Sequence, residues 1–412
     1  MNRRFSRMLA AIVLFAIAVR LAIRAALGTQ AYWQDGYGLY ARLAVQLSGG
    51  RGYAFAGGPP TAYRVPLYPL FVAATSGGTN AWGLIAAQAL VSGLTVGLTG
   101  MIARHLAGDR AGLLAALVLA LWPYSAWHDL SLQETGLFAC LSALATLLAM
   151  QAPRSRRAAL AAGLAMGLAM LTRATLLPWA ALAIGWIGWR AGLRKAALAL
   201  AALLLTLSPW LAWSWQVTGN PVLGTESGAQ LYAGNHALTF TAYPARSIDE
   251  SRAVIFAAHT PAEKSQLAAL RADPLATDRW YRSRALAEIA AHPGRFLHGA
   301  ARKLWAAFGP WPSPRHGFRA DLAYAAGWLP FAGLAAAGLW LRRRHWRDDL
   351  PATLHLPAFM LTSALFWAQT AHRSAIDFAL AVFAGIALSH LLPRMAAWGK
   401  GAPSNPRTLE RT

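Results

Sequence analysis

The sequence predicts an all-α, polytopic membrane protein with about ten transmembrane helices. Of its 412 residues, 56% are hydrophobic and 13% are charged, whereas about 25% of the residues of a soluble protein are charged. Apolar runs close to the ~20 residues that cross a bilayer recur along most of the chain. The 18 tryptophans and 11 tyrosines fit interfacial belts, since amphipathic rings prefer the headgroup level.

Clusters of basic residues punctuate the apolar runs and set the predicted topology. These clusters are Arg3/Arg4/Arg7, Arg104/Arg110, Arg154/Arg156/Arg157, Arg190/Arg194/Lys195, Arg342/Arg343/Arg344/Arg347 and Arg394/Lys400. Placing every cluster on the cytoplasmic side leaves an even number of spans between successive clusters, as the positive-inside rule requires. The net charge of +22 therefore indicates orientation in a membrane, and no nucleic-acid partner is expected, because no continuous basic stripe exists.

The predicted spans follow from the apolar runs between these clusters. They cover residues 8–27, 81–103, 111–127, 132–150, 158–174, 176–190, 196–215, 324–341, 351–370 and 376–393. The first run resembles a signal peptide but lacks a convincing cleavage site, so we expect it to stay as a span. The fifth and sixth spans are so close that they must form a tight hairpin between Arg173 and Pro178.

Two long segments between spans fall on the outer side. We expect an N-terminal transmembrane catalytic module over residues 1–215, which includes a first outer loop at 28–80. The other parts are an outer subdomain at 216–323, C-terminal transmembrane helices at 324–393 and a cytoplasmic tail at 394–412. Helical periodicity in the second outer loop predicts helices at 262–272, 278–291 and 293–308.

Acidic residues are scarce, with 16 Asp and Glu against 38 Lys and Arg. The topology assigns four acids to the cytoplasmic side and eight to the second outer loop. The remaining four lie at outer ends of spans, and they are Asp35, Asp129, Glu134 and Asp377. The isolated arginines at similar positions are Arg64, Arg173 and Arg373. Because charges at membrane depth are costly, these residues predict one polar, outward-facing cavity.

Each of these residues also has a simpler interpretation. Arg173 could extend its guanidinium to the lipid headgroups. Glu134 could stabilise the start of its helix through the helix dipole, and Asp35 could be a turn residue. Solvated or interfacial charges would account for Arg64, Arg373 and Asp129. The single cysteine, Cys140, excludes an intramolecular disulfide and metal sites built from cysteine pairs.

A series of motifs runs through most of the chain in a fixed order. They are Asp35, Tyr40-Ala41, Gly50 to Tyr53, Arg64 to Phe71, Gln133 to Thr135, Ala162 to Ala174, Pro209 to Asn235, His292 to Phe296 and His372 to Asp377. In this order they resemble the GT-C fold glycosyltransferases of the family 39 type, which include protein O-mannosyltransferases and lipid A aminoarabinose transferases. That family often has Asp-Glu where this chain has Asp35-Gly36, so the first acid is kept and the second is lost.

The resemblance implies a GT-C glycosyltransferase of the cell envelope. It would move a sugar from a polyprenyl-phosphate donor to a hydroxyl of a lipid, glycan or protein acceptor, with inversion, on the outer face of the inner membrane. The expected catalytic residues are Asp35, as general base, and Glu134. The expected substrate-binding residues are Tyr40, Tyr63, Arg64, Tyr68, Asp129, Arg173, His372 and Arg373. No cofactor or metal is expected, because arginines can neutralise the leaving phosphate.

A transporter, flippase or ligase of polyprenyl-linked glycans is the alternative function, because it also needs an outward cavity lined by arginines. A carrier has no need of a carboxylate beside a phosphate-binding arginine, so Asp35 and Arg64 favour the enzyme. A catalytically inactive protein of the same fold is a third hypothesis. Transfer by an Asp35→Asn variant separates the three.

Overall fold

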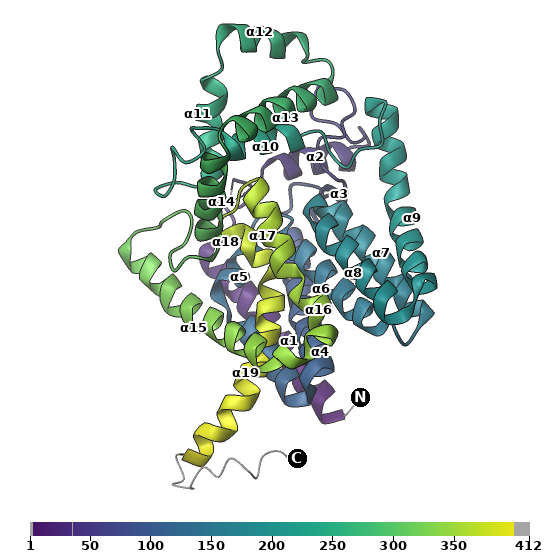
Figure 1. The fold of residues 1–412 in the computed structure, drawn as a ribbon, viewed down its shortest axis with the longest axis vertical. Coiled ribbons are helices and arrows are strands. Elements are labelled where there is room, and N and C mark those ends of the chain that lie inside the picture. The colour runs from purple at the N-terminus through teal and green to yellow at the C-terminus, as the bar shows by residue number, and fades with distance from the viewer. Residues whose placement is uncertain (1–2, 35, 399–412) are drawn as a thin grey trace.

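The computed structural model describes residues 3–34 and 36–398, and helices make up most of this part of the chain. Asp35 and residues 399–412 of the predicted tail lie outside the described residues. The long or apolar helices are α1 (Arg3–Leu27), α4 (Ala81–Leu121), α6 (Thr135–Gln151), α7 (Arg156–Thr172), α8 (Leu177–Ala191), α9 (Leu193–Thr218), α15 (Phe318–Arg342), α17 (His355–Leu365) and α19 (Asp377–Trp398). The start of α1 and the end of α19 lie at the same end of the molecule (Figure 1).

Five helical segments among the described residues are long and apolar enough to cross a membrane, and the chain is a multi-pass membrane protein. These segments are Arg3–Leu27, Ala81–Leu121, Leu193–Thr218, Phe318–Thr353 and Thr370–Leu392. The predicted spans at 132–150, 158–174 and 176–190 coincide with the shorter helices α6, α7 and α8, which have 17, 17 and 15 residues. Two predicted spans, 81–103 and 111–127, share α4, which is interrupted by non-helical backbone at Ala107 and Gly108.

The ends of some helices differ from the predicted limits, for local reasons. Helix α4 ends at Leu121 because Trp122 precedes Pro123 and takes an extended conformation, and the short α5 (Pro123–Asp129) follows. The predicted span 351–370 is divided between α16 (Trp346–Thr353), which follows η3 (Arg343–His345), and α17. The predicted hairpin at Arg173 is confirmed, since η1 (Ala174–Leu176) joins α7 to α8.

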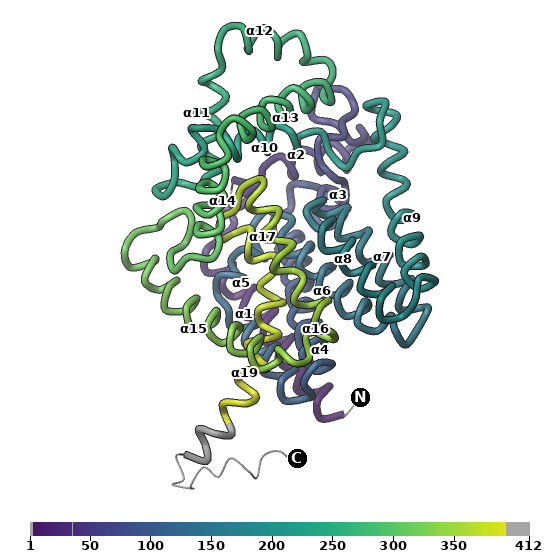
Figure 2. The backbone as a smooth tube through the Cα atoms, viewed as in Figure 1, coloured from purple at the N-terminus to yellow at the C-terminus, as the bar shows by residue number. Residues whose placement is uncertain are grey.

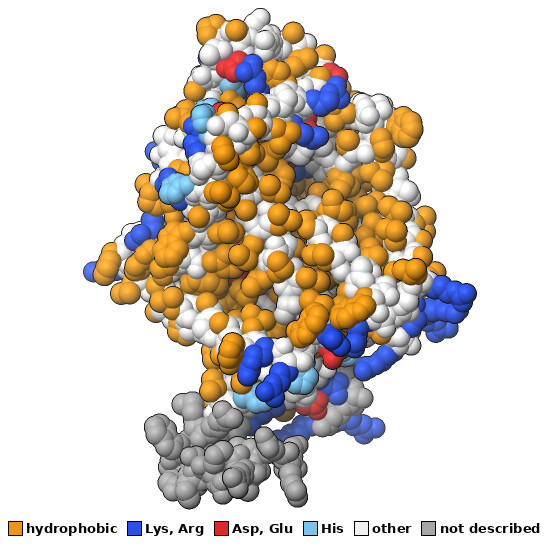
Figure 3. Space-filling model, viewed as in Figure 1, with side chains coloured by type: hydrophobic (Ala, Val, Ile, Leu, Met, Phe, Trp, Pro, Cys, Tyr) orange, Lys and Arg blue, Asp and Glu red, His pale blue; other side chains and the backbone are white. Residues whose placement is uncertain are grey.

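The two largest hydrophobic cores among the described residues meet at α6. One core is formed by α1, α4, α15 and α19, and the second by α7, α8 and α9, while residues of α6 contribute to both. Hydrophobic side chains cover the middle of the face in Figure 3, and Lys and Arg gather at the end where α1 begins. This distribution matches a membrane-embedded band with basic residues beyond one edge.

The two outer loops contain further helices and gather at the opposite end. The first loop contains α2 (Leu39–Ser48) and α3 (Leu67–Ser76). The second contains α10 (Ser227–Asn235), η2 (Ile248–Glu250), α11 (Ser251–Ala257), α12 (Pro261–Ala269), α13 (Pro274–Ala291) and α14 (Pro293–Phe308). Figure 2 shows α10 and α13 side by side near this end, with α14 leading down towards α15. The three helices predicted in the second loop are confirmed as α12, α13 and α14, each with proline in its first turn.

Candidate active site

A cavity of about 630 Å³ lies where the two outer loops meet the start of α6, the α7–α8 hairpin and α17. Both outer loops contribute charged or polar side chains to its lining, among them Tyr37, Arg64, Glu226 and Arg252. Apolar side chains come mainly from the hairpin and α17, including Leu177, Trp179, Phe359 and Leu361. The cavity therefore presents both charge and hydrocarbon to a ligand.

The first outer loop holds Arg64 through its backbone and its side chain. The Tyr53 hydroxyl donates a hydrogen bond to the carbonyl oxygen of Arg64 at 2.9 Å. The Nη1 atom of Arg64 donates to the Tyr40 hydroxyl at 3.4 Å, and its Nε atom lies 2.5 Å from Oε1 of Glu226. The guanidinium also lies over the ring of Tyr37, with 5.9 Å between its Cζ atom and the ring centroid. Arg64 thus faces the cavity from a fixed position.

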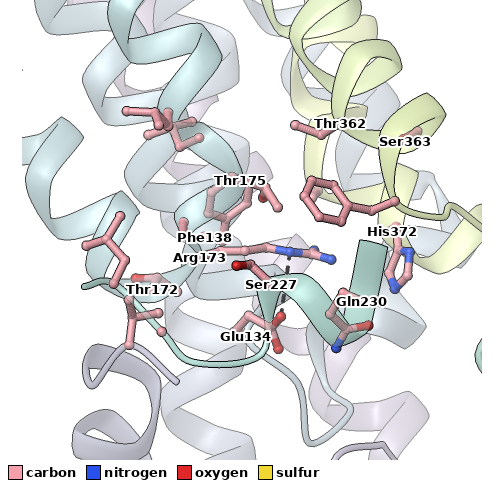
Figure 4. A pocket seen from close by; sticks show the side chains of 18 of the residues that line it. Glu134, Phe138, Thr172, Arg173, Thr175, Ser227, Gln230, Thr362, Ser363 and His372 are labelled. Carbon is pink, nitrogen blue, oxygen red and sulfur yellow. Dashed lines mark ion pairs between the residues drawn. The ribbon is translucent and has the colours of Figure 1, made fainter. Parts of the chain in front are cut away.

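Glu134 and Arg173 form a second charge pair in the cavity. Nε of Arg173 lies 3.6 Å from Oε1 of Glu134 (Figure 4, dashed line). Glu134 directly precedes α6, but its side chain does not cap the helix. It is 2% exposed, and its Oε2 atom is buried without a hydrogen-bond partner among the described residues. Figure 4 shows Gln230 beside Glu134, so two oxygen-bearing side chains face the same space.

A backbone contact joins the first outer loop to the segment before Glu134. Gly36 forms an isolated parallel bridge with Leu132, and the Tyr37 amide donates to the Leu132 carbonyl oxygen at 2.9 Å. Gly36 has a φ of +102°, and a Cβ atom built there would lie 2.5 Å from that oxygen. A glutamate, which the family often has at this position, therefore does not fit this backbone.

Tyrosines and a histidine complete the polar part of the cavity. The Tyr37 hydroxyl lies 3.4 Å from Nε2 of His372, which belongs to α18 (Thr370–Arg373). Burial raises the pKa of Tyr37 and of Tyr40 above the usual range, because it disfavours the phenolate form. Burial also raises the pKa of Tyr63, which lines the same cavity. All three therefore present neutral hydroxyls at neutral pH.

The structure brings together six of the predicted site residues. The residues that line the cavity are Tyr40, Tyr63, Arg64, Glu134, Arg173 and His372. Tyr68 lies behind them, edge-on to Tyr40 with 4.8 Å between the ring centroids. Asp35, the predicted general base, lies outside the described residues.

Three other charges predicted to share the cavity do not line it. Nη2 of Arg20 in α1 lies 3.3 Å from the Asp129 carboxylate, inside the helix bundle. Arg373 is fully buried, with its Cζ atom 3.4 Å from the ring centroid of Trp328. Asp377 lies 3.8 Å from Arg373. The expectation of one cavity for all isolated charges was wrong for these residues, because each has a neighbour within the bundle.

Sequence reasoning missed the charges that the second outer loop contributes. The residues concerned are Glu226, Asp249, Arg252 and Arg282, and all of them line the cavity. The predicted topology assigns Glu226 and Asp249 to the second outer loop and gives them no place in the cavity. The turn-rich stretch from Gly219 to Gly228 was the available signal, since it returns the chain towards the first loop.

Comparison with known proteins supports the architecture. A sequence model of the family described as dolichyl-phosphate-mannose-protein mannosyltransferase matches residues 66–213. The matched part runs from α3 to α9 and contains Glu134 and Arg173, but neither Arg64 nor Glu226. A comparison with curated proteins gives no match.

Solved structures of ArnT and of an oligosaccharyltransferase share the arrangement of helices. ArnT from Cupriavidus metallidurans, in the apo state, has 17% identity and a TM-score of 0.54, over 89% of this chain and 57% of that chain. Its structure with undecaprenyl phosphate has 17% identity and a TM-score of 0.56, over 97% and 62%. The apo oligosaccharyltransferase of Archaeoglobus fulgidus has 12% identity and a TM-score of 0.54, over 98% and 53%.

The chain has the GT-C fold. It spans less than two thirds of the length of these solved proteins. Within this GT-C fold, the cavity between the outer loops and the hairpin is the place where the predicted site residues meet.

Proposed function

We propose that this chain is a membrane glycosyltransferase. It transfers a sugar from a polyprenyl-phosphate donor to a hydroxyl of a lipid, glycan or protein acceptor, with inversion of configuration. The donor and the active site lie on the outer face of the inner membrane. The chain then divides into a catalytic membrane module, residues 1–215, an outer subdomain, 216–323, further membrane helices, 324–393, and a cytoplasmic tail, 394–412.

The observation that supports this function best is the mixed lining of the cavity. Arg64 and Arg173 provide cationic groups near the outer loops, and Leu177, Trp179 and Phe359 provide apolar walls. A ligand with an anionic head and a long hydrocarbon tail matches both parts. The ArnT structure with undecaprenyl phosphate shows that a protein of this fold binds such a lipid.

The proposed chemistry separates proton removal from stabilisation of the leaving group. As the acceptor hydroxyl attacks the anomeric carbon, its proton moves to the Asp35 carboxylate. The bond between the anomeric carbon and the phosphate oxygen breaks, and the electron pair stays on the lipid phosphate. Arg64 and Arg173 stabilise the charge that develops there, because fixed guanidiniums bind phosphate with two N–H groups.

The remaining polar residues orient the sugar and the acceptor. The Oε2 atom of Glu134, which has no hydrogen-bond partner among the described residues, accepts a hydrogen bond from a hydroxyl of the sugar or the acceptor. Tyr40, Tyr63 and His372 offer further hydrogen-bonding groups in the same cavity. In this proposal Tyr68 supports Tyr40 from behind.

The test is sugar transfer by Asp35→Asn. Purified protein in lipid nanodiscs is supplied with a panel of radiolabelled polyprenyl-phosphate sugars and an envelope extract as acceptor source. We expect Asp35→Asn to lower the transfer rate by roughly 10²–10⁴-fold, as for loss of a general base. Asp273→Asn is the matched control, because Asp273 caps α13 outside the cavity and asparagine also caps helices.

Arg64→Gln provides an independent arm of the same test. We expect it to lower transfer by about 10²-fold or more and to weaken binding of undecaprenyl phosphate. Undiminished transfer by Asp35→Asn would refute the assignment of the base. Binding of prenyl-linked glycans without transfer of any sugar by the wild type would favour a carrier, flippase or ligase.

A further inference from the structure

The pair formed by Arg64 and Glu226 joins the two outer loops inside the cavity. Nε of Arg64 lies 2.5 Å from Oε1 of Glu226, and the two side chains are 21% and 13% exposed. Gln230 holds the other carboxylate oxygen by donating a hydrogen bond from Nε2 at 2.9 Å. Glu226 of the second loop is therefore paired with Arg64, the arginine that binds the donor phosphate in the proposed function.

Charge, and not an aligned hydrogen bond, holds this pair together. The buried Nε–H of Arg64 has no hydrogen-bond partner of good geometry among the described residues, although the carboxylate is close. Arginine binds phosphate best through two parallel N–H bonds. A phosphate oxygen on the axis of the Nε–H bond would make the hydrogen bond that Glu226 does not make.

We propose that Glu226 is a built-in substitute for the donor phosphate, an inference that rests on the proposed function. In the empty cavity it pairs with Arg64 and avoids an uncompensated, largely buried guanidinium. The phosphate of the lipid donor displaces it and takes its place on Arg64. After transfer, Glu226 competes with the prenyl phosphate for the same guanidinium and favours release of the product.

Displacement of Glu226 also changes the contact between the two loops. Glu226 directly precedes α10, and beside it the Thr225 amide donates a hydrogen bond to the Tyr63 carbonyl oxygen at 3.4 Å. Gly224 packs against the same oxygen, which would lie 3.1 Å from a Cβ atom built there. Release of Glu226 therefore removes the ion pair between the two loops and leaves the backbone contact between Thr225 and Tyr63.

The start of α10 is hydrogen-bonded to α13, so release of Glu226 affects both helices together. The Gly228 amide donates to Oδ1 of Asp278, and the Ser227 hydroxyl donates to Oδ2 of the same residue, at 3.3 Å. Arg282 pairs with Asp278 at 2.6 Å. Binding of the donor thereby loosens the second loop as a unit and gives the acceptor access to the cavity.

Binding of undecaprenyl phosphate to Glu226→Gln tests this proposal. Wild type and variant are compared in nanodiscs by titration with the lipid. We expect the variant to bind about fivefold more tightly, since it loses a competing ion pair but keeps the shape of the side chain. Glu263→Gln is the control, because Glu263 is a second-loop acid paired with Arg284 at 3.7 Å and does not line the cavity.

Hydrogen exchange measured with and without lipid separates displacement of Glu226 from a purely structural role, because only displacement makes the lipid speed exchange in the wild type. In the wild type, undecaprenyl phosphate should speed exchange of the amides at residues 225–230. In Glu226→Gln these amides should exchange faster already without lipid and change little on its addition. Equal or weaker binding by the variant, with normal binding by the wild type, would overturn this inference and leave the proposed function standing. Failure of both proteins to bind the lipid would overturn both.

Discussion

At the scale of single residues, the position of Asp129 shows how a membrane bundle uses a buried acid. Its carboxylate receives hydrogen bonds from Ser92 and from Ser125, the latter at 3.4 Å, and pairs with Arg20 at 3.3 Å. Nη1 of Arg20 also donates to the carbonyl oxygen of Ala120, at 3.3 Å. The group ties α1, α4 and α5 together, and we therefore assign Asp129 to the stability of the fold.

Asp129→Asn should destabilise the protein without changing its affinity for lipid phosphate. Loss of one partner leaves Arg20 buried without a counter-charge, which costs about 3–5 kcal/mol. Thermal unfolding in detergent measures the stability, and titration of the folded variant with undecaprenyl phosphate measures the affinity. Normal stability together with lost affinity would restore the substrate-binding role that the sequence suggested.

Several residues of the site were predictable from the sequence because charged residues are rare near its apolar runs. The sequence did not predict which charged residues have partners from distant segments. Arg64, Glu134 and Arg173 are charges isolated at the ends of apolar runs, and each faces the cavity. Arg373 has the same sequence signature but lies against Trp328. The direction of a side chain depends on tertiary packing, which periodicity and composition do not encode. For the same reason the sequence does not distinguish Glu226 from the other acids of the second loop.

At the scale of elements, α14 is attached to the rest of the molecule through a buried lysine. Lys303 is fully buried and donates hydrogen bonds to the carbonyl oxygens of Gly234 and Phe366, at 3.1 and 3.0 Å, and to Oδ1 of Asn235 at 3.2 Å. It thereby joins α14 to the ends of α10 and α17. Burial lowers the pKa of Lys303 to about 7, because a low dielectric disfavours the ammonium form.

The pKa of Lys303 predicts stability that depends on pH. The unfolded chain keeps this proton up to its ordinary pKa of 10.5, whereas the folded chain loses it near 7. Between these values the unfolded state binds more protons, so the contribution of Lys303 to stability rises with pH. We expect the Tm of the wild type minus the Tm of Lys303→Met to increase from pH 7 to pH 10, because only the wild type gains this stability.

The control for this experiment is Lys264→Met, on the exposed face of α12. Its Tm difference from the wild type should stay nearly constant over the same range of pH. A constant difference for Lys303→Met as well would contradict the lowered pKa.

The elements themselves were largely predictable, because apolar runs and helix-start residues are local signals. The short stretch around Arg173 predicts the hairpin. The helix predicted at 278–291 begins earlier, at Pro274, because Asp273 caps it and proline suits its first turn. The end of α17 at Leu365 carried no comparable signal. There the chain leaves the helix to meet α10 and Lys303, through contacts at the carbonyls of Leu365 and Phe366.

At the scale of the whole molecule, the asymmetry of charge predicts how the protein sits in the membrane. Basic clusters such as Arg154 to Arg157 should face the cytoplasm, and the second outer loop should face outwards. With Cys140→Ala as background, we expect Ser265→Cys to react with an impermeant maleimide in intact cells. Arg156→Cys should react only after permeabilisation. The reverse pattern would invert the topology and place the cavity on the cytoplasmic side.

The lining of the cavity extends along the chain from Tyr37 to Ile376, and this sets a condition on biosynthesis. A nascent chain that has reached the end of α9 already contains Arg64, Glu134 and Arg173, but not the wall that α17 provides. Until the last helices have been made, these charges border an open side of the bundle. The translocation machinery or a chaperone must therefore shield them from lipid, and a protein truncated before α17 should be degraded early.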